Sequence, residues 1–148
     1  GAPFQKNLTS GLGLVSETVE TAVTWERWPD LDASVRQAIQ ETMGRLCAGS
    51  RVTCRFTHIY PDGPAPYFTF EGLGKLGAEL ENFEEIKRAA SDAVLAAGGT
   101  ITHHHAVGRL HRPWYDRQRP ELFAQALRAA KRAVDPNGVL NPGVLIDP

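Results

Sequence analysis

Hydrophobic and polar residues alternate along several short segments, which is the pattern of half-buried β-strands. Residues 19–25 and 51–60 show it most clearly. A short aromatic run at 67–70 follows the turn sequence Pro61-Asp62-Gly63, so residues 51–70 are expected to form a hairpin. A brief further strand is expected over residues 100–102. The alternation therefore predicts four strands.

Helical spacing of hydrophobic residues marks three other segments, residues 31–46, 82–97 and 119–134. Pro29 is expected to end the preceding strand, and Asp30 or Asp32 to cap the first helix. The second helix is expected to end at Gly98-Gly99, because glycine readily adopts the left-handed conformation that follows many helices. Residues between 104 and 118 show no clear period and are expected to form an irregular, basic stretch.

The order of these elements is β-α-β-β-α-β, followed by a helix and an extended tail. This order is typical of the ferredoxin-like split βαβ motif. It predicts an α+β fold in which two helices cover one face of an antiparallel sheet, with the 119–134 helix packed separately. The second face of such a sheet has to be polar or covered, and we expect that something else packs there.

The composition does not indicate a function, but it argues against some classes of protein. The chain has 148 residues, a formal net charge of -1 and 22% charged residues, which is ordinary for a globular domain. It indicates neither a nucleic-acid-binding nor a membrane-surface protein, and no apolar run reaches the roughly 20 residues of a membrane span. Cys47 and Cys54 are expected to be buried thiols in a reducing compartment, which favours a cytoplasmic location.

The most unusual feature is a run of three histidines, His103, His104 and His105, after the expected strand at 100–102. Three interpretations are open: a metal site, a surface accident, and a cluster that faces a substrate or cofactor. Adjacent strand residues point to opposite faces, so the three rings cannot all reach one ion without a bend, even with His58 as a further ligand. We favour the third interpretation, because imidazoles exchange protons near neutral pH.

Tyr67 is the second candidate. Phe68 and Phe70 share the alternation of the core, so Tyr67 is expected on the opposite face, with Thr57 or Ile59 across the hairpin. The prolines near the turn can introduce a bulge that shifts this register.

The glycines at 72, 74 and 77 match the G-x-G-x-x-G pattern of dinucleotide-binding proteins. They follow the second arm of a hairpin, however, and not the first strand of a parallel βαβ unit. A flexible loop is the expected structure.

Several motifs occur together in a characteristic order: "ETVETAVTW", "CRFTHIY", "YFTF", "GGTITHHHAVG" and "VDPNGVLNPG". In this order they resemble the carboxy-terminal part of FAD-linked oxidases of the vanillyl-alcohol-oxidase superfamily, and among these the alkyldihydroxyacetonephosphate synthases of ether-lipid synthesis. Two positions depart from that pattern. Lys6 stands where the relatives carry an arginine, and Ala106 stands where a glycine is usual.

The resemblance implies that the chain is the C-terminal fragment of a larger flavoenzyme. Residues 1–103 would form the cap, or substrate, domain. Residues 104–148 would form an active-site segment, a helix and a tail that returns to an N-terminal FAD-binding domain. The cofactor would be FAD in the full-length protein, and the fragment alone is expected to be inactive and not to bind FAD tightly. A homodimer is a further expectation.

The same resemblance implies roles for individual residues. Tyr67 and the histidines 103–105 would be catalytic, and Lys6 would meet the substrate phosphate together with Arg109 and Arg112, which we add because of their charge. His104, His105 and Asn141 would contact the cofactor. The reaction would exchange the acyl chain of acyl-dihydroxyacetone phosphate, a lipid-like substrate, for a long-chain alcohol.

Two alternatives remain at this point. One is an FAD-linked alcohol or 2-hydroxy-acid oxidase or dehydrogenase of the same superfamily. Some of these enzymes hold a metal, but here Tyr67 and His104 replace ligands of that set. The other is a ferredoxin-like binding module without catalysis.

Overall fold

A computed structural model describes residues 12–147 and separates them into two compact units. The first, which we call the sheet unit, comprises the described residues up to His103. The second, the C-terminal unit, begins at His104. The interpretation of the first as a substrate domain and of the second as an active-site segment stays a prediction.

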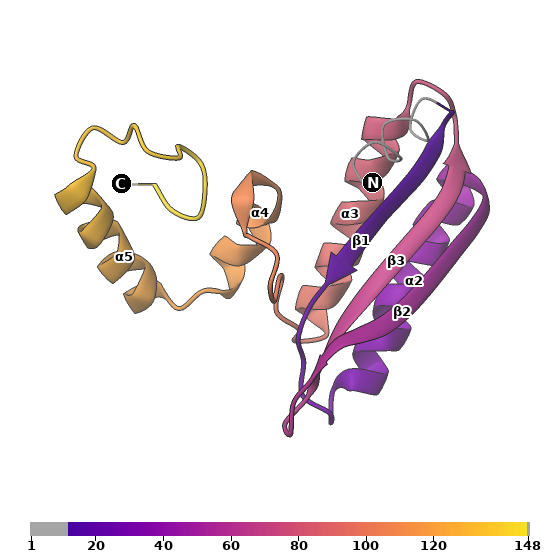
Figure 1. Cartoon of the computed structure of the whole chain (residues 1–148), viewed down its shortest axis with the longest axis horizontal. Helices are drawn as coiled ribbons and strands as arrows, with labels where there is room; N and C mark the ends of the chain where they lie inside the picture. Colours follow the sequence, from indigo (N-terminus) through magenta and orange to yellow (C-terminus); the bar gives the residue numbers. More distant parts are fainter. Residues whose placement is uncertain (1–11, 148) are drawn as a thin grey trace. The chain divides into compact units, whose positions relative to one another are not determined.

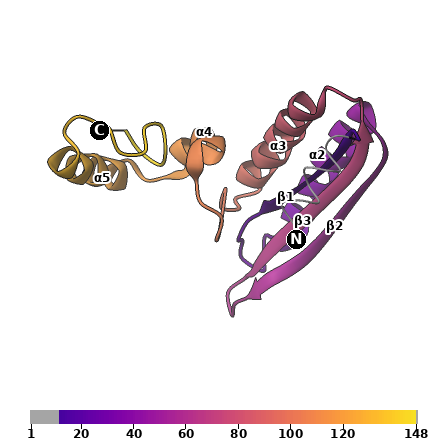
Figure 2. The ribbon, with the colours of Figure 1, turned by 45° about the horizontal axis from the view of Figure 1, so that its top comes forward.

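The sheet unit contains three antiparallel strands in the order β1-β3-β2 and two helices. Both helices lie on the same side of the sheet (Figures 1 and 2). The elements are β1 (Leu14–Glu20), α2 (Trp28–Leu46), β2 (Cys47–Ile59), β3 (Pro64–Gly74) and α3 (Glu79–Ala96). The predicted α+β fold, an antiparallel sheet with helices on one face, is confirmed.

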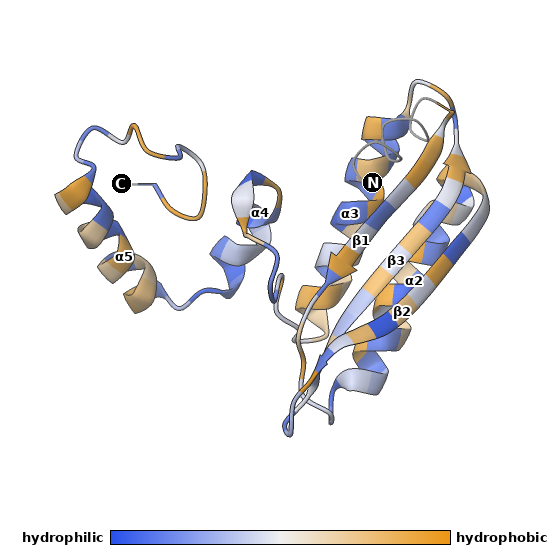
Figure 3. Ribbon diagram, in the orientation of Figure 1, coloured by the Kyte–Doolittle hydropathy of each residue, from blue (hydrophilic) through white to orange (hydrophobic). Residues whose placement is uncertain are grey.

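The core lies between the sheet and the two helices. Phe68 and Phe70 of the central strand are fully buried there, against Ile39 of α2 and Ile86 of α3. Figure 3 shows hydrophobic and hydrophilic residues alternating along the strands, as the sequence pattern predicted. Burial of each such side chain stabilises the fold by about 1.5–3 kcal/mol.

The strand predicted at 19–25 lies earlier in the chain than expected, since β1 spans Leu14–Glu20. The chain beyond it still runs along β3: the Thr21 N–H donates to the Pro66 carbonyl at 3.1 Å, and the Val23 N–H to the Pro64 carbonyl at 3.3 Å. Both partners are prolines and have no N–H to donate in return. The ladder is therefore one-sided at this point, and the regular strand ends.

The predicted fourth strand is wrong. Residues 100–102 run beside the segment that follows β1, but threonine side chains make most of the contacts. The Thr100 N–H donates to the Ala22 carbonyl at 3.0 Å, whereas the Ala22 N–H donates to the Thr100 hydroxyl at 3.0 Å. The Thr21 hydroxyl donates to the Thr100 carbonyl at 2.6 Å. Side-chain hydroxyls thus take the backbone partners that a fourth strand needs.

The first helix begins three residues before its predicted start at residue 31. Helix α2 begins at Trp28, so Pro29 lies in its first turn, where proline is well tolerated. Arg27 occupies the N-cap position without a side-chain cap, so neither Asp30 nor Asp32 caps the helix. Gly98 follows α3 with a φ of 79°, and the predicted glycine at the helix C-terminus is confirmed.

The C-terminal unit contains α4 (Gly108–Gln118) and α5 (Glu121–Val134). The predicted helix at 119–134 is confirmed as α5, but the irregular stretch expected before it is wrong. Pro113 and many charged residues conceal the period of α4. Its buried side chains, His111 and Trp114, are three residues apart, which is the spacing of one helix face.

The glycine-rich segment is also more regular than expected. Gly72 and Gly74 lie within β3 rather than in a loop. A Cβ atom on Gly72 would lie 2.7 Å from Cε of Met43 and 2.9 Å from Cβ of Cys47. Gly72 therefore allows α2 to pack closely on the sheet, and its structural role is unrelated to phosphate binding.

Candidate functional site

The sheet has one face that points away from α2 and α3, which we call the open face. Cross-strand pairing places Glu20, Tyr67 and Arg55 in one row across the three strands. The next row consists of Thr18, Thr69 and Thr53. A third row contains the Arg51–Glu71 ion pair at 3.1 Å. The open face is therefore polar, and polarity is one of the two ways in which such a face is tolerated.

Tyr67 lies on the open face, as predicted. It is half-buried, and the guanidinium of Arg55 lies over its ring at 5.0 Å from the ring centre. The expected partners across the hairpin were wrong, since Tyr67 pairs with Arg55 and not with Thr57 or Ile59. The bulge anticipated from the prolines is present, between Phe56 and His58. It shifts the pairing only beyond Tyr67, toward the turn.

Three aromatic side chains meet at the end of the β2–β3 hairpin, and we call them the three-ring cluster: His58, Tyr60 and His103. The His58 and Tyr60 rings are stacked with their centres 5.9 Å apart. The His103 ring is edge-on to both, at 5.1 Å from His58 and 5.7 Å from Tyr60. The Tyr60 hydroxyl and His103 Nε2 lie 3.1 Å apart, within hydrogen-bond distance.

Glu20 anchors this cluster to the sheet. Its carboxylate is almost fully buried, with 1% of the side chain exposed. Oε1 accepts hydrogen bonds from the Thr102 hydroxyl at 2.7 Å and from the His103 backbone N–H at 2.8 Å. Because Glu20 also pairs with Tyr67 in the register, it connects the two residues that the sequence singled out. Sequence reasoning missed Glu20, since nothing in the alternation shows that a polar position of β1 is buried.

The chain passes from one unit to the other within the histidine triplet. His103 belongs to the sheet unit, whereas His104 and His105 belong to the C-terminal unit, where their rings lie edge-on with centres 4.8 Å apart. The fourth histidine of this region, His111, is buried in α4 with Nδ1 3.1 Å from the Ala106 carbonyl. His58 and His103 each offer a ring nitrogen to a metal, and two such ligands are half of the set in a four-coordinate zinc site.

The two arginines considered for phosphate binding have partners within the C-terminal unit. Arg109 donates to the Pro142 carbonyl from Nε at 3.2 Å and from Nη2 at 3.0 Å. Arg112 pairs with Asp116 at 2.8 Å and with Asp147 at 2.9 Å, which raise its pKa against the opposing effect of burial. The Arg112 Nη1 atom is buried and has no hydrogen-bond partner among the described residues. Lys6, the third candidate, lies outside the described residues.

Asn141, which the sequence analysis expected to contact the cofactor, lies in the segment after α5. Asn141 adopts a positive φ of 47° and accepts a hydrogen bond from the Val144 N–H at 3.1 Å. The loop before it is organised by Asp135, which receives hydrogen bonds from Lys131 at 2.7 Å and from the backbone N–H groups of Val139 and Leu140. These contacts give the "DPNG" segment a structural role.

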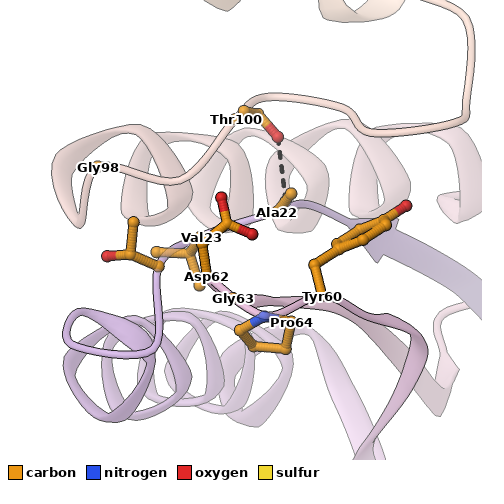
Figure 4. Close-up of a pocket in the computed structure, with 9 residues that line it drawn as sticks. Ala22, Val23, Tyr60, Asp62, Gly63, Pro64, Gly98 and Thr100 are labelled. Atoms are coloured by element: carbon orange, nitrogen blue, oxygen red, sulfur yellow. Dashed lines mark hydrogen bonds between the residues drawn. The ribbon is translucent and has the colours of Figure 1, made fainter.

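A shallow hollow of about 290 Å³ adjoins the three-ring cluster. The Tyr60 ring forms one end of it, and the Asp62 carboxylate lies between Tyr60 and Gly98 (Figure 4). The Ala22–Thr100 hydrogen bond runs along its side. Apart from Asp62, the groups that line the hollow are mostly apolar or backbone.

The open face carries groups that can form hydrogen bonds with a ligand. Hydroxyl groups of Thr18, Thr53 and Thr69, with the Tyr67 phenol and the Arg55 guanidinium, are the kind of groups that hydrogen-bond to the carbonyl and nitrogen atoms of an isoalloxazine ring. Of the glycine pattern that suggested a pyrophosphate site, Gly72 and Gly74 lie in β3 and Gly77 lies in the turn after it. None of the helices in the described residues is long and apolar enough to cross a membrane.

Comparison with known proteins relates this chain to flavoenzymes. It is 32% identical to an alkyldihydroxyacetonephosphate synthase of Caenorhabditis elegans over 97% of this chain and 25% of that protein. A synthase of Trypanosoma brucei brucei is 28% identical over 97% of this chain and 24% of its own length. The GlcD subunit of the glycolate oxidase of Bacillus subtilis is 31% identical over 61% of this chain.

The chain therefore spans about a quarter of the length of the synthases it matches. A solved structure of an alkyldihydroxyacetonephosphate synthase superposes with a TM-score of 0.60 at 17% identity, over 95% of this chain and 22% of that one, which supports the fold. The family model for the C-terminal domain of FAD-linked oxidases matches residues 2–145. The chain thus belongs to the family of FAD-linked oxidase C-terminal domains.

Proposed function

We propose that this chain is the substrate domain and C-terminal tail of an FAD-dependent enzyme that resembles the alkyldihydroxyacetonephosphate synthases. The observation that carries the proposal is the similarity to these synthases over 97% of the chain. The reaction would replace the acyl chain of acyl-dihydroxyacetone phosphate with a long-chain alcohol. An N-terminal domain of the same protein would bind the FAD.

Within this proposal, the open face and the three-ring cluster supply groups that exchange protons. Tyr67 carries a phenol, and Glu20, its partner in the β1–β3 register, binds the backbone of His103. FAD, when bound, supplies the redox-active ring at which the substrate reacts. The residues of this chain would orient the substrate, exclude water and transfer protons, while His104, His105 and Asn141 would approach the cofactor.

The substrate phosphate would need a cationic partner in the protein. Lys6, Arg109 and Arg112 remain the candidates. The contacts of Arg109 and Arg112 within the C-terminal unit leave fewer of their N–H groups for an anion. Lysine is also a weaker partner than arginine for a phosphate, because it lacks the planar fork that binds two oxygens.

The test is the Tyr67→Phe variant of the full-length protein. We expect it to lose roughly 100- to 10,000-fold in turnover, the usual cost of losing one general acid or base, while flavin content stays unchanged. Tyr115→Phe is a matched control, because Tyr115 is also half-buried beneath an arginine, Arg119, at 5.3 Å. The assay follows incorporation of a labelled long-chain alcohol into acyl-dihydroxyacetone phosphate. Near wild-type exchange by Tyr67→Phe would refute the role of Tyr67.

The second candidate is an FAD-linked oxidase or dehydrogenase for 2-hydroxy acids or alcohols. The similarity to the glycolate oxidase subunit favours it, although that similarity covers less of the chain. The same preparation distinguishes the two candidates. If a hydroxy acid reduces the flavin and no alcohol is exchanged, the synthase proposal fails. The family match over residues 2–145 favours either flavoenzyme over a free-standing binding module.

A further inference from the structure

Two residues that the sequence analysis did not select, Glu20 and Tyr60, contact His103. Glu20 binds its backbone and faces Nδ1, and Tyr60 lies against Nε2. We propose that Glu20 is a positioning residue that fixes the ring and the tautomer of His103, and that Tyr60 carries protons between His103 and the substrate. This inference rests on the proposed function, because it names further residues of the same site.

The first step concerns position. The buried Glu20 carboxylate accepts two hydrogen bonds on the same oxygen, from Thr102 and from the His103 backbone. Hydrogen bonds to an ionised, buried group are roughly twice as strong as those between neutral groups. Moving His103 away from the sheet would leave this carboxylate with unsatisfied hydrogen-bonding capacity, which is costly in a buried site. His103 is therefore held rigidly at the end of the sheet.

The second step concerns the proton on the ring. His103 Nδ1 lies 3.8 Å from Glu20 Oε2, which is too far for a hydrogen bond. At this distance the negative charge still favours an N–H group over a lone pair on Nδ1. With the proton on Nδ1, Nε2 is an acceptor, and the Tyr60 hydroxyl donates to it. His58 also faces His103, and the Nδ1 of His58 lies 3.3 Å from the Thr57 hydroxyl.

The third step follows from access. Both ring nitrogens of His103 face protein groups, Nδ1 toward Glu20 and Nε2 toward Tyr60. Tyr60 itself is 40% exposed and borders the hollow. A substrate that reaches the exposed end of the Tyr60 side chain would exchange its proton with the Tyr60 oxygen. As that oxygen takes the substrate proton, its own O–H bond breaks and an N–H bond forms on Nε2. The resulting imidazolium would be stabilised by the Glu20 carboxylate.

The experiment measures the tautomer of His103 in this chain. Histidine rings labelled with ¹⁵N report which nitrogen carries the proton, and His103→Gln assigns the signal. We expect the Nδ1–H form to dominate in the wild type at a pH where the ring is neutral. We expect Tyr60→Phe to convert at least about a third of the population to the Nε2–H form. Glu20→Gln should weaken the preference in the same direction. Glu17→Gln on the same strand and Tyr115→Phe serve as controls and should leave it unchanged.

Glu20 is buried, so Glu20→Gln could prevent folding, and Tyr60→Phe at an exposed position provides the independent variant. An Nε2–H tautomer in the wild type, or an unchanged tautomer in Tyr60→Phe, would overturn the inference. In the full-length enzyme, Tyr60→Phe is expected to reduce kcat roughly tenfold or more with little change in KM. An unchanged kcat would overturn the role of Tyr60 as proton carrier. If the full-length protein shows no alcohol exchange while the tautomer result holds, only the proposed reaction fails.

Discussion

At the scale of single residues, the buried partners of His103 explain how a run of three histidines can be divided between two units. His103 is linked to the sheet through the Glu20 carboxylate, which also accepts a hydrogen bond from the Thr102 hydroxyl, and not through a strand. The neighbouring histidines follow the C-terminal unit. The three identical side chains therefore have different physical environments, and substitutions at the three positions should not be equivalent.

The two cysteines provide a prediction at the same scale. Burial, reinforced by the charge of Asp32, raises the pKa of the Cys54 thiol to about 11. The pKa of Cys47 is also raised by burial. Because the thiolate is the nucleophile, Cys54 should react with iodoacetamide at pH 8 roughly 100-fold more slowly than an unhindered thiol, and more slowly than Cys47. Mass spectrometry of timed samples measures both rates.

Urea-unfolded chain is the control for this reaction, because both thiols should then react at similar, faster rates. Equal rates for Cys54 in the folded and unfolded chain would contradict the prediction.

Among single residues, the sequence was informative where the role follows from alternation and uninformative where it follows from long-range contact. Tyr67 was placed on the correct face because Phe68 and Phe70 fix the parity of β3. Glu20 and Tyr60 were not recognised as site residues, since their contacts with His103 join positions 83 and 43 residues apart. Such partners become visible only when the topology is known.

At the scale of elements, prolines and threonines decide where regular structure stops. Pro64 and Pro66 limit β1, and the hydroxyls of Thr21 and Thr100 replace the ladder of a fourth strand. Both effects depend on side chains that lack or compete for backbone hydrogen bonds, and a pattern of hydrophobicity does not record them. Helices α2 and α3, by contrast, were predicted within a few residues because each buries a clear apolar stripe.

The hairpin turn between β2 and β3 provides a prediction about stability. Gly63 closes the turn with Tyr60, and a Cβ atom on Gly63 would lie only 1.9 Å from the Val23 carbonyl oxygen. Gly63→Ala should therefore destabilise the sheet unit by roughly 1–3 kcal/mol or more. Gly44→Ala in α2 is the matched control, because a Cβ atom there meets nothing within 4 Å. It should be neutral or stabilising by up to about 1 kcal/mol.

Urea unfolding followed by circular dichroism measures the free energy of unfolding of each variant. Equal unfolding midpoints for Gly63→Ala and the wild type would show that the turn can move away from Val23 at no cost.

The loop after α5 provides a prediction about pH. The Lys131 ammonium, with the N–H groups of Leu140 and Val139, holds the pKa of the Asp135 carboxyl below its usual value. A carboxyl whose pKa is lower in the folded state stabilises that state above its unfolded pKa of about 4. This contribution is lost as the pH falls through the lower, folded value. The loop should therefore loosen on acidification below about pH 4 and remain ordered at neutral pH.

Amide NMR signals of Val139 and Leu140 between pH 7 and pH 2 measure this change. Asp135→Asn should remove the pH dependence of these two signals. Signals that stay unchanged down to pH 2 in the wild type would contradict the prediction.

At the scale of the whole molecule, the described residues contain no glycine-rich turn at the start of a parallel βαβ unit, the element that binds the pyrophosphate of a dinucleotide. Of the glycines at 72, 74 and 77, the first two lie within β3. We therefore expect that this chain alone does not bind FAD tightly. Flavin fluorescence during titration with the chain measures binding, and full-length protein is the positive control.

Saturable binding of FAD by this chain at micromolar concentration or tighter would contradict this expectation. It would also mean that the flavin ring alone provides enough contacts for affinity, without a pyrophosphate site.

The hydrogen bond between Glu20 and His103 joins positions 83 residues apart, and this separation affects when the site forms during folding. Closing so long a segment costs chain entropy that only the rest of the folded unit can offset. During synthesis, β1 leaves the ribosome well before its partner at residue 103 does. We therefore expect the three-ring cluster to form late in folding, after the strands and helices between Glu20 and His103 have brought the two residues together.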